Sequence, residues 1–308
     1  MPPPRRGTAR TPPGPATAVA PRESRSARTE ERAGMATGQT TVGVLGAGRM
    51  GMPIIGHLVR HGFTVLVHDV DPDKEPAVAE RGARFTGSPA QIAAQCDTVL
   101  VCVGYEEQLR ELMLGADGML GALGEGAVVA VLSTVSPEVM GGLAEAAQKH
   151  GVHVVDAPVC RGSWAADAGE LLSLLGGTEE AAAKFTEVAR AYSSDIVRIG
   201  DIGAGQVAKA VNNLILWACL VADHEGLALA HRHGVDIESL REALKMSSAA
   251  NHALDNWNNQ TMAWAEDDMK IVSEMAAAKG IGLPQAAVNR EVCRVLKPRR
   301  YDLDRYGA

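Results

Sequence analysis

The strongest constraint on the fold is a glycine-rich turn, Gly46-Ala47-Gly48-Arg49-Met50-Gly51, that separates two structured segments. An apolar run at residues 42–45 precedes it and suits a buried parallel strand, while residues 52–61 follow with helical periodicity. A second apolar run, residues 64–68, then ends at Asp69. The stretch therefore predicts a βαβ unit, in which the glycines allow strand, helix and any ligand to approach one another closely.

The glycine spacing of this turn is typical of dinucleotide-binding folds, in which the helix N-terminus attracts the pyrophosphate. Asp69 stands where a carboxylate would accept hydrogen bonds from the adenosine ribose and repel the 2′-phosphate of NADP. Because Val70 follows it and not an arginine, the sequence favours NAD over NADP. The alternative is a tight turn without a ligand, beside a solvated Asp69. The expected cofactor-binding residues are Gly46, Gly48, Arg49, Met50, Gly51, Asp69, Val103 and Thr134.

Composition narrows the class of protein. Hydrophobic residues make up 46% of the 308 residues and charged residues 22%, which suits a soluble protein of two globular domains. The net charge of −7 argues against a nucleic-acid partner. The five cysteines share no short spacing, so we expect no disulfide, no metal site and a cytoplasmic location. The absence of an apolar run of about 18 residues argues against a membrane partner.

Residues 1–38 have the composition of a disordered extension. They are rich in proline, carry seven arginines against three glutamates, and lack the apolar periodicity needed to bury a core. The rest of the chain then has 23 basic and 34 acidic residues, a net charge of −11. Met35, just before the first predicted strand, is a candidate translation start. A mitochondrial transit peptide is an alternative, although the prolines oppose the amphipathic helix that it needs.

The remainder is expected to divide into two domains. Residues 39–200 alternate strands with helices, and further strands are expected at 83–85, 97–103, 127–132, 153–156, 171–175 and 196–199. This pattern predicts an α/β domain with a Rossmann-type doubly wound sheet of about eight strands, which binds ligands at the carboxyl ends of its strands. In residues 201–308 a helix over 206–233, on the order of 40 Å long, is expected to lead into an all-helical domain for substrate binding and dimerisation.

Four motifs in order resemble the β-hydroxyacid dehydrogenase family, which includes 3-hydroxyisobutyrate dehydrogenases, tartronate semialdehyde reductases and sulfolactaldehyde reductases. They are G-A-G-R-M-G-M-P-I at 46–54, L-S-T-V-S-P-E at 132–138, D-A-P-V-C-R-G at 156–162 and G-A-G-Q-V-A-K-A-V-N-N at 203–213. The resemblance spans about residues 40–296. It implies a Rossmann domain, a helical second domain, and reversible NAD(P)-linked oxidation of a short 3-hydroxy acid or reduction of its aldehyde.

The matching positions imply the catalytic residues. Lys209 would protonate the alkoxide that hydride transfer leaves, and would act as the base in the reverse reaction. Asn213, four residues further along the helix, shares its face and would hydrogen-bond the same substrate, whereas Asn212 faces another way and is expected to cap or pack. Ser133 and Thr134, at the end of a predicted strand, are expected to donate to the substrate or the nicotinamide. Without the motif, Lys209 would be interpreted as a solvated helix lysine.

One departure from the family pattern concerns substrate binding. The usual D-x-P-V-S-G-G is here D-A-P-V-C-R-G, which makes Cys160, Arg161 and Gly162 the expected substrate contacts. The guanidinium of Arg161 offers a two-pronged donor for a carboxylate, sulfonate or phosphate, and this predicts a small, strongly anionic substrate. The alternative is an Arg161 turned to solvent. Cys160 is expected to pack, because no base is spaced to activate it.

A second departure lies near residues 264–270. The family has a lysine followed by an aspartate and a leucine, and here Asp267 occupies the place of that lysine after a shortened loop. Lys270 lies about one helical turn further on and is expected to replace the lysine as a cofactor contact.

The sequence thus predicts an NAD-dependent oxidoreductase that interconverts a small acidic 3-hydroxy compound and its semialdehyde, with Lys209 as general acid and base. We expect a homodimer or homotetramer. Two alternatives are a catalytically silent NAD(P)-binding module and an imine-reductase-like enzyme. The presence of both Lys209 and Asn213 favours the dehydrogenase.

Overall fold

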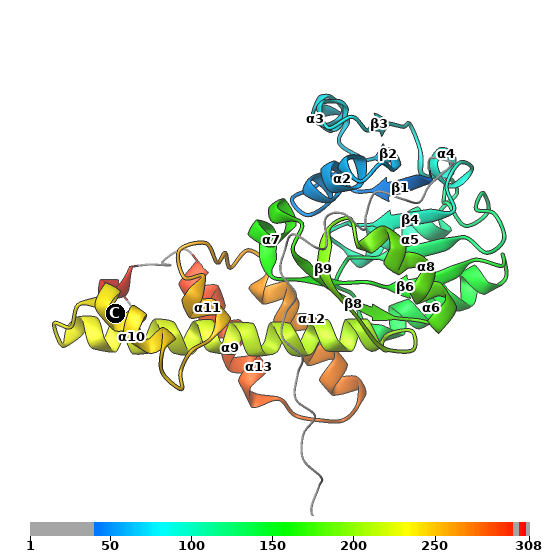
Figure 1. Cartoon of the computed structure of the whole chain (residues 1–308). Helices are drawn as coiled ribbons and strands as arrows, with labels where there is room; N and C mark the ends of the chain where they lie inside the picture. The colour runs from blue at the N-terminus through cyan, green and yellow to red at the C-terminus, as the bar shows by residue number, and fades with distance from the viewer. Residues whose placement is uncertain (1–39, 298–301, 306–308) are drawn as a thin grey trace, which may run out of the picture. The chain divides into compact units, whose positions relative to one another are not determined.

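The computed structural model of this chain describes residues 40–297 and 302–305 (Figure 1). The predicted extension, residues 1–38, and the candidate start Met35 lie outside the described residues. The described residues form one compact unit.

Within the described residues, nine strands form one sheet in the order β3-β2-β1-β4-β5-β6-β8-β7, with β9 paired to β8. The strands β1 to β6 run parallel, β8 runs antiparallel to β6 and β7, and β9 runs parallel to β8. Their bounds are β1 Thr41–Leu45, β2 Thr64–His68, β3 Arg84–Phe85, β4 Thr98–Val101, β5 Val128–Val131, β6 His153–Asp156, β7 Val159–Cys160, β8 Leu171–Gly176 and β9 Ser193–Gly200.

The predicted α/β doubly wound sheet is confirmed, with one strand added. The sequence did not predict β7, because two residues are too few to show a period. The antiparallel pairing of β8 was also not predicted, since an apolar run contains no information about strand direction.

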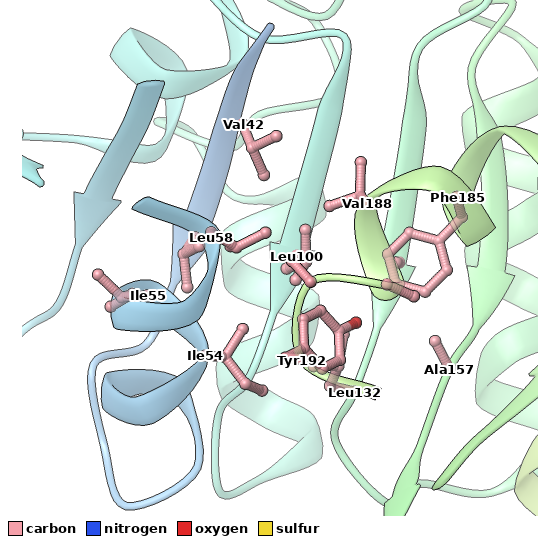
Figure 2. Packing of buried hydrophobic residues seen from close by; sticks show 14 of the residues in the cluster. Val42, Ile54, Ile55, Leu58, Leu100, Leu132, Ala157, Phe185, Val188 and Tyr192 are labelled. Atoms are coloured by element: carbon pink, nitrogen blue, oxygen red, sulfur yellow. The ribbon is translucent and has the colours of Figure 1, made fainter. Parts of the chain in front are cut away.

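Helices cover both faces of the sheet. They are α2 Gly51–Arg60, η1 Pro72–Lys74, α3 Glu75–Glu80, α4 Pro89–Ala93, α5 Glu106–Leu114, α6 Pro137–Gln148, α7 Gly162–Ala168 and α8 Glu179–Ala189. Successive strand residues belong to opposite cores: Leu100 packs with α2 and α8, while Val99 and Val101 pack on the other side with α5 and α6. Figure 2 shows Leu58 of α2 and Phe185 of α8 around Leu100. The unbroken apolar runs follow from this burial on both faces.

The long helix α9, Ala204–Arg232, has 29 residues and a length of about 43 Å. Its first turns pack on β8 and β9, and its remainder packs on α11 His252–Asp255, α12 Ala265–Ala278 and α13 Pro284–Leu296. The helix α10, Ile237–Lys245, and the short η3, Leu303–Arg305, complete this helical part (Figure 1). The predicted interdomain helix and helical second part are confirmed, while the division at residues 200 and 201 stays a prediction.

Buried side chains of α9, α12 and α13 form a third hydrophobic cluster, which includes Trp217, Leu220, Met269 and Cys293. Among the described helices, α9 alone has the length and mean hydropathy of a candidate membrane span, 1.3 over 18 residues, of which 33% are buried. The core helix of a globular domain passes the same test of length and composition.

A buried carboxylate fixes where α9 begins. Asp156, at the end of β6, accepts hydrogen bonds from the backbone N–H of Gly203 at 2.8 Å and of Gln206 at 3.1 Å. The Gln206 side chain in turn accepts from Val135 N at 3.1 Å and donates to Ser133 O at 2.9 Å. These bonds attach the start of α9 to the carboxyl ends of β5 and β6, and they place Lys209 at the same edge of the sheet.

Candidate active site

A cavity of about 720 Å³ opens between the carboxyl edge of the sheet and the helices α9, α11 and α12. Most of the predicted site residues line it: Gly48, Arg49, Met50, Val103, Ser133, Thr134, Cys160, Arg161, Gly162, Lys209 and Asn213. Gly46, Gly51, Asp69 and Lys270 do not. Within residues 40–297 and 302–305, no group of three or more His, Cys, Asp or Glu side chains is arranged to hold a metal ion.

The three glycines of the turn have different surroundings. Gly46 has a φ of 103°, and a Cβ on it would collide with the carbonyl oxygen of Cys102. A Cβ on Gly51 would collide with the carbonyl oxygen of Gly46, so these two glycines allow strand and helix to meet. Gly48 has open space within 4 Å of its Cβ position and lines the cavity. The turn therefore has room for a pyrophosphate at its second glycine.

The start of α2 also suits an anion. Its N-cap residue, Met50, makes no side-chain capping bond, and the first turn has no acidic residue. The N–H of Met52 donates to Gly48 O at 2.9 Å, so an anion would be bound by the N–H groups that precede it. Arg49 extends across the cavity and donates from Nη2 to Ser163 Oγ at 2.7 Å. The open glycine, the uncapped helix start and the basic side chain fit the diphosphate of NAD.

Asp69 connects the end of β2 to the glycine-rich turn. Its Oδ2 accepts from Ala47 N at 2.7 Å, and its Oδ1 accepts from Asp71 N at 2.9 Å. These bonds fix the orientation of the carboxylate beside the turn. Because each oxygen has a second lone pair, Asp69 keeps the capacity to accept hydrogen bonds from ribose hydroxyls.

Lys209 and Asn213 lie on one face of α9 in the cavity wall. Lys209 Nζ donates to Val159 O at 2.7 Å and lies 3.9 Å from Cys160 Sγ. Asn213 is buried, and its Oδ1 accepts from Asn212 Nδ2 at 3.0 Å. The expectation that Asn212 faces another way is therefore wrong, because its side chain reaches the same cavity and contacts its neighbour.

The hydroxyl of Ser133 bridges the ends of two strands. It accepts from Val103 N at 2.9 Å and donates to Val103 O at 2.8 Å. Its hydrogen is thus used within the protein, and only acceptor capacity remains for a ligand. Thr134, the next residue, also lines the cavity.

Two further residues that line the cavity, Asp268 and Trp217, were not predicted from the sequence. Asp268 of α12 lines the cavity, and its Oδ2 accepts from Trp217 Nε1 at 2.9 Å. Burial raises the pKa of Asp268, and the positive charge of Lys209 opposes that shift, followed by hydrogen bonds from Trp217 and Asn213. The sequence signal for Asp268 was the family pattern, in which an aspartate follows the lysine whose place Asp267 occupies.

Cys160 and Arg161 lie at the end of β7. Cys160 is 4% exposed, and burial raises the pKa of its thiol against the charges of Lys209 and Arg161. Among the described non-glycine residues, Arg161 alone has a positive φ, 85°. The conformation favours glycine, the residue that the family pattern has there, and it costs an arginine about 1–2 kcal/mol.

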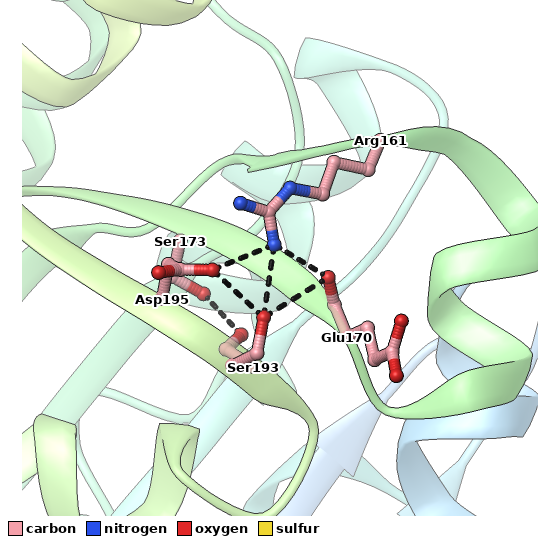
Figure 3. A network of polar contacts seen from close by, with 6 residues as sticks. Arg161, Glu170, Ser173, Ser193 and Asp195 are labelled. Atoms are coloured by element: carbon pink, nitrogen blue, oxygen red, sulfur yellow. Dashed lines mark hydrogen bonds and ion pairs between the residues drawn. The ribbon is translucent and has the colours of Figure 1, made fainter. Parts of the chain in front are cut away.

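The guanidinium of Arg161 is held by groups at the ends of β8 and β9. Its Nη1 donates to Glu170 O and Ser194 Oγ, each at 2.9 Å, and forms an ion pair with Asp195 Oδ2 at 2.8 Å (Figure 3). The Arg161 side chain is still 33% exposed, so its role as a substrate contact stays a prediction. A substrate anion would have to share the guanidinium with Asp195.

Lys270 does not reach the cavity. It is exposed on α12, and its Nζ lies 3.8 Å from Glu274 of the same helix. Asp267 and Asp268 line the cavity instead, so this part of the wall is acidic.

Two protein families match the chain. Residues 41–200 match the family described as the NAD binding domain of 6-phosphogluconate dehydrogenase. Residues 203–305 match the family described as NAD-binding of NADP-dependent 3-hydroxyisobutyrate dehydrogenase. Together they cover both parts of the described fold.

Individual relatives agree with these matches. The chain is 33% identical over 220 residues to mitochondrial 3-hydroxyisobutyrate dehydrogenase of Mus musculus. The aligned residues cover 71% of this chain and 66% of that protein. It is 35% identical over 219 residues to 3-hydroxyisobutyrate dehydrogenase of Pseudomonas aeruginosa, 71% and 74% of the two chains. The structure of Mycobacterium tuberculosis 3-hydroxyisobutyrate dehydrogenase with L-serine has a TM-score of 0.78 at 24% identity, covers 88% of this chain and 100% of that one, and shows a common fold.

Proposed function

The chain belongs to the β-hydroxyacid dehydrogenase family, and from this we propose that it is an NAD-dependent oxidoreductase of a small acidic 3-hydroxy compound and its semialdehyde. The observation that carries the proposal is the placement of Lys209 and Asn213 on one face of α9, in the same cavity as the glycine-rich turn. A cofactor-binding module without activity would not need this pair.

The cofactor would be held by the residues at the turn. Gly48 and the start of α2 would bind the diphosphate, Asp69 the adenosine ribose, and the Val103 and Thr134 positions would lie beside the nicotinamide end. Bound NAD supplies the acceptor of the hydride in oxidation and, when reduced, its donor.

The residues of this chain would then handle the proton. We propose that Lys209 Nζ donates a proton to the oxygen of the aldehyde as it becomes an alcohol, and takes it back in oxidation. Asn213 would hydrogen-bond the same oxygen and fix its place. The hydrogen bond of Lys209 to Val159 O keeps the amine at the end of β7, next to the predicted substrate contacts.

The substrate is proposed to be a small anion. Cys160, Arg161 and Gly162 form the end of the cavity near Lys209, and Arg161 is its candidate anion partner despite the ion pair with Asp195. The assembly is proposed to be a homodimer or homotetramer in the cytoplasm. Exposed Val207, Val211 and Ile215 recur every four residues along α9, which supports self-association.

The proposed activity can be tested by measuring the oxidation of NADH in the presence of short aldehydes that carry a carboxylate, a sulfonate or a phosphate. A cyclic imine in the same assay tests the imine-reductase alternative.

We expect Lys209→Ala to lower kcat about 10²-fold or more, because the proton donor is lost, while the Kd for NADH changes less than twofold. The control is Lys279→Ala, an exposed lysine at the end of α12. Full turnover in Lys209→Ala would refute the mechanism.

A further inference from the structure

A thiol and an amine from different elements of the fold meet at Cys160 and Lys209. Cys160 ends β7, Lys209 lies in the first turns of α9, and the distance from Nζ to Sγ is 3.9 Å. A hydrogen bond of 2.7 Å from Nζ to Val159 O holds the amine beside the sulfur. The sequence did not reveal this neighbour of Cys160, because 49 positions separate the two residues.

Both residues line the cavity, so a small solute can reach the pair although Cys160 is only 4% exposed. Two more cysteines, Cys102 and Cys219, line the same cavity, and all three are free thiols. Among the hydrogen bonds of the described residues, Cys160 is the one thiol that has a side-chain amine as its partner. The cavity therefore contains one thiol with an amine beside it and two thiols that serve as comparisons.

We propose that Cys160 and Lys209 form a redox modification site, at which hydrogen peroxide couples the two side chains through a sulfur–nitrogen bond. A cysteine oxidised to its sulfenic acid condenses with nitrogen to give a sulfenamide, and here the nitrogen is the amine of Lys209. The family pattern has a serine at position 160, and a serine cannot form this bond.

The coupling takes place in two steps. In the first, Sγ of Cys160 attacks one oxygen of hydrogen peroxide and the O–O bond breaks. The departing hydroxide leaves as water with the thiol proton, and the sulfur, now a sulfenic acid, has lost two electrons to the peroxide. In the second, the amine of Lys209 attacks the sulfur, the S–O bond breaks, and the hydroxyl group leaves as water with one amine proton. One thiol, one amine and one peroxide thus give one S–N bond and two waters.

The geometry favours the second step over further oxidation. Burial raises the pKa of the Cys160 thiol, so the first step should be slow. The sulfenic acid then lies beside the amine, whereas oxidation to a sulfinic acid requires a second peroxide molecule from solution. Because a reaction between two groups held side by side is effectively unimolecular, coupling should be faster than further oxidation at low peroxide concentration.

The modification would stop the proposed reaction, since a Lys209 nitrogen bonded to sulfur no longer supplies a proton. This consequence rests on the proposed function, whereas the bond itself does not. A thiol reductant reverses the coupling: two reductant thiols become a disulfide, and their hydrogens return to Cys160 and Lys209.

Peptide mapping tests the bond without turnover. The full-length protein is treated with hydrogen peroxide until half of its Cys160 no longer reacts with iodoacetamide after denaturation, and is then digested without reductant. Because trypsin cleaves after Lys and Arg, Cys160 lies in the peptide 150–161, and a modified Lys209 lies in the uncleaved peptide 199–232. We expect these two peptides to be joined, with a mass about 2 Da below their sum. Dithiothreitol should separate them and restore cleavage after Lys209.

Cys219→Ser is the matched control, because Cys219 lies in the same cavity and in the same long peptide. The joined peptides should form in Cys219→Ser and be absent in Cys160→Ser. A link that disappears in Cys219→Ser would be a disulfide, and it would overturn the proposal. Recovery of the lost Cys160 as a sulfinic acid would overturn it too, as would a Cys160 that stays a free thiol when Cys219 is fully oxidised.

Turnover separates the bond from the proposed function. Oxidation of NADH with an acidic aldehyde should fall in proportion to the joined fraction and return with dithiothreitol. Joined peptides in a protein with undiminished turnover, or in one that converts no substrate before treatment, would refute the proposed function alone.

Discussion

At Arg161, backbone conformation and side-chain contacts have opposite effects on stability. The φ of 85° is unfavourable for an arginine, while three contacts of Nη1 connect it to β8 and β9. If the guanidinium also binds the substrate anion, a variant without it loses both the contacts with β8 and β9 and the binding of the anion.

We expect Arg161→Ala and Arg161→Gly to lower kcat/KM for an anionic aldehyde about 30-fold or more, because a charge partner is removed, and to affect a neutral aldehyde of similar size much less. The two variants should differ in stability, since only glycine adopts a positive φ without strain. Arg161→Gly should be more stable than Arg161→Ala by about 0.5–1 kcal/mol in urea denaturation. Equal losses for charged and neutral substrates would show that Arg161 is structural.

Asp69 is the residue predicted to favour NAD over NADP. We expect kcat/KM with NADH to exceed that with NADPH at least tenfold, about 1.4 kcal/mol, because a 2′-phosphate would meet this carboxylate. Asp69→Ala should reduce the ratio, and Asp73→Ala, an exposed acid in η1, should not. Because Asp69 also binds Ala47 N, the variant should weaken binding of both cofactors somewhat. A ratio unchanged in Asp69→Ala would contradict this assignment.

At the scale of elements, the junction of β6 and α9 determines the position of the helix face that carries Lys209. Asp156 is fully buried and accepts two backbone N–H groups from the start of α9. Burial raises the pKa of Asp156, and those hydrogen bonds partly oppose the shift. The position of Lys209 thus depends on a carboxylate four residues before Cys160 in the sequence.

The raised pKa has a consequence for stability. A carboxyl group whose pKa is higher in the folded state stabilises the fold fully below its unfolded pKa, about 3.9, and loses this contribution as the pH rises through the folded value. Asp156→Asn should cost about 1–3 kcal/mol, because an amide offers one acceptor oxygen to two N–H groups. The difference from the wild type in urea denaturation should be largest in acid and decrease as the pH rises. A difference that grows with pH would contradict this.

Helices and strands with an apolar pattern over many residues could be predicted from the sequence. Very short strands, and contacts between residues far apart in the sequence, could not. The strands and α9 were expected within a few residues, because apolar runs and the 3.6-residue period extend over many positions. The strand β7 and the contacts of Arg161 with β8 and β9 depend on tertiary packing. Asp268 lies on a helix more than 50 residues after Lys209, so no local spacing indicates that both side chains line one cavity. The family pattern supplied the predicted pair Lys209 and Asn213, while the fold showed which other side chains share their cavity.

At the scale of the whole molecule, three hydrophobic clusters account for the stability of the described residues. Two lie on the faces of the sheet, and the third lies among α9, α11, α12 and α13. All of their members lie in residues 42–296. The composition of residues 1–38 offers no comparable apolar set.

We therefore expect deletion of residues 1–34 to leave the melting temperature and kcat unchanged within error, as Met35 would then begin the chain. Thermal denaturation of the truncated and full-length proteins measures this, and the turnover assay accompanies it. A lower melting temperature in the shorter protein would show that the removed segment binds to the rest.

The segment between α10 and α12 has a consequence for protein engineering. Its Asn256, Asn259 and Thr261 line the cavity, while its buried Leu254 and Trp257 belong to the third cluster and hold it in place. The groups proposed for hydride and proton transfer lie elsewhere, on α9 and at the edge of the sheet. A mutant library confined to Asn256, Asn259 and Thr261, with Leu254 and Trp257 kept, should therefore change which substrates are accepted without altering the groups proposed for the chemical step.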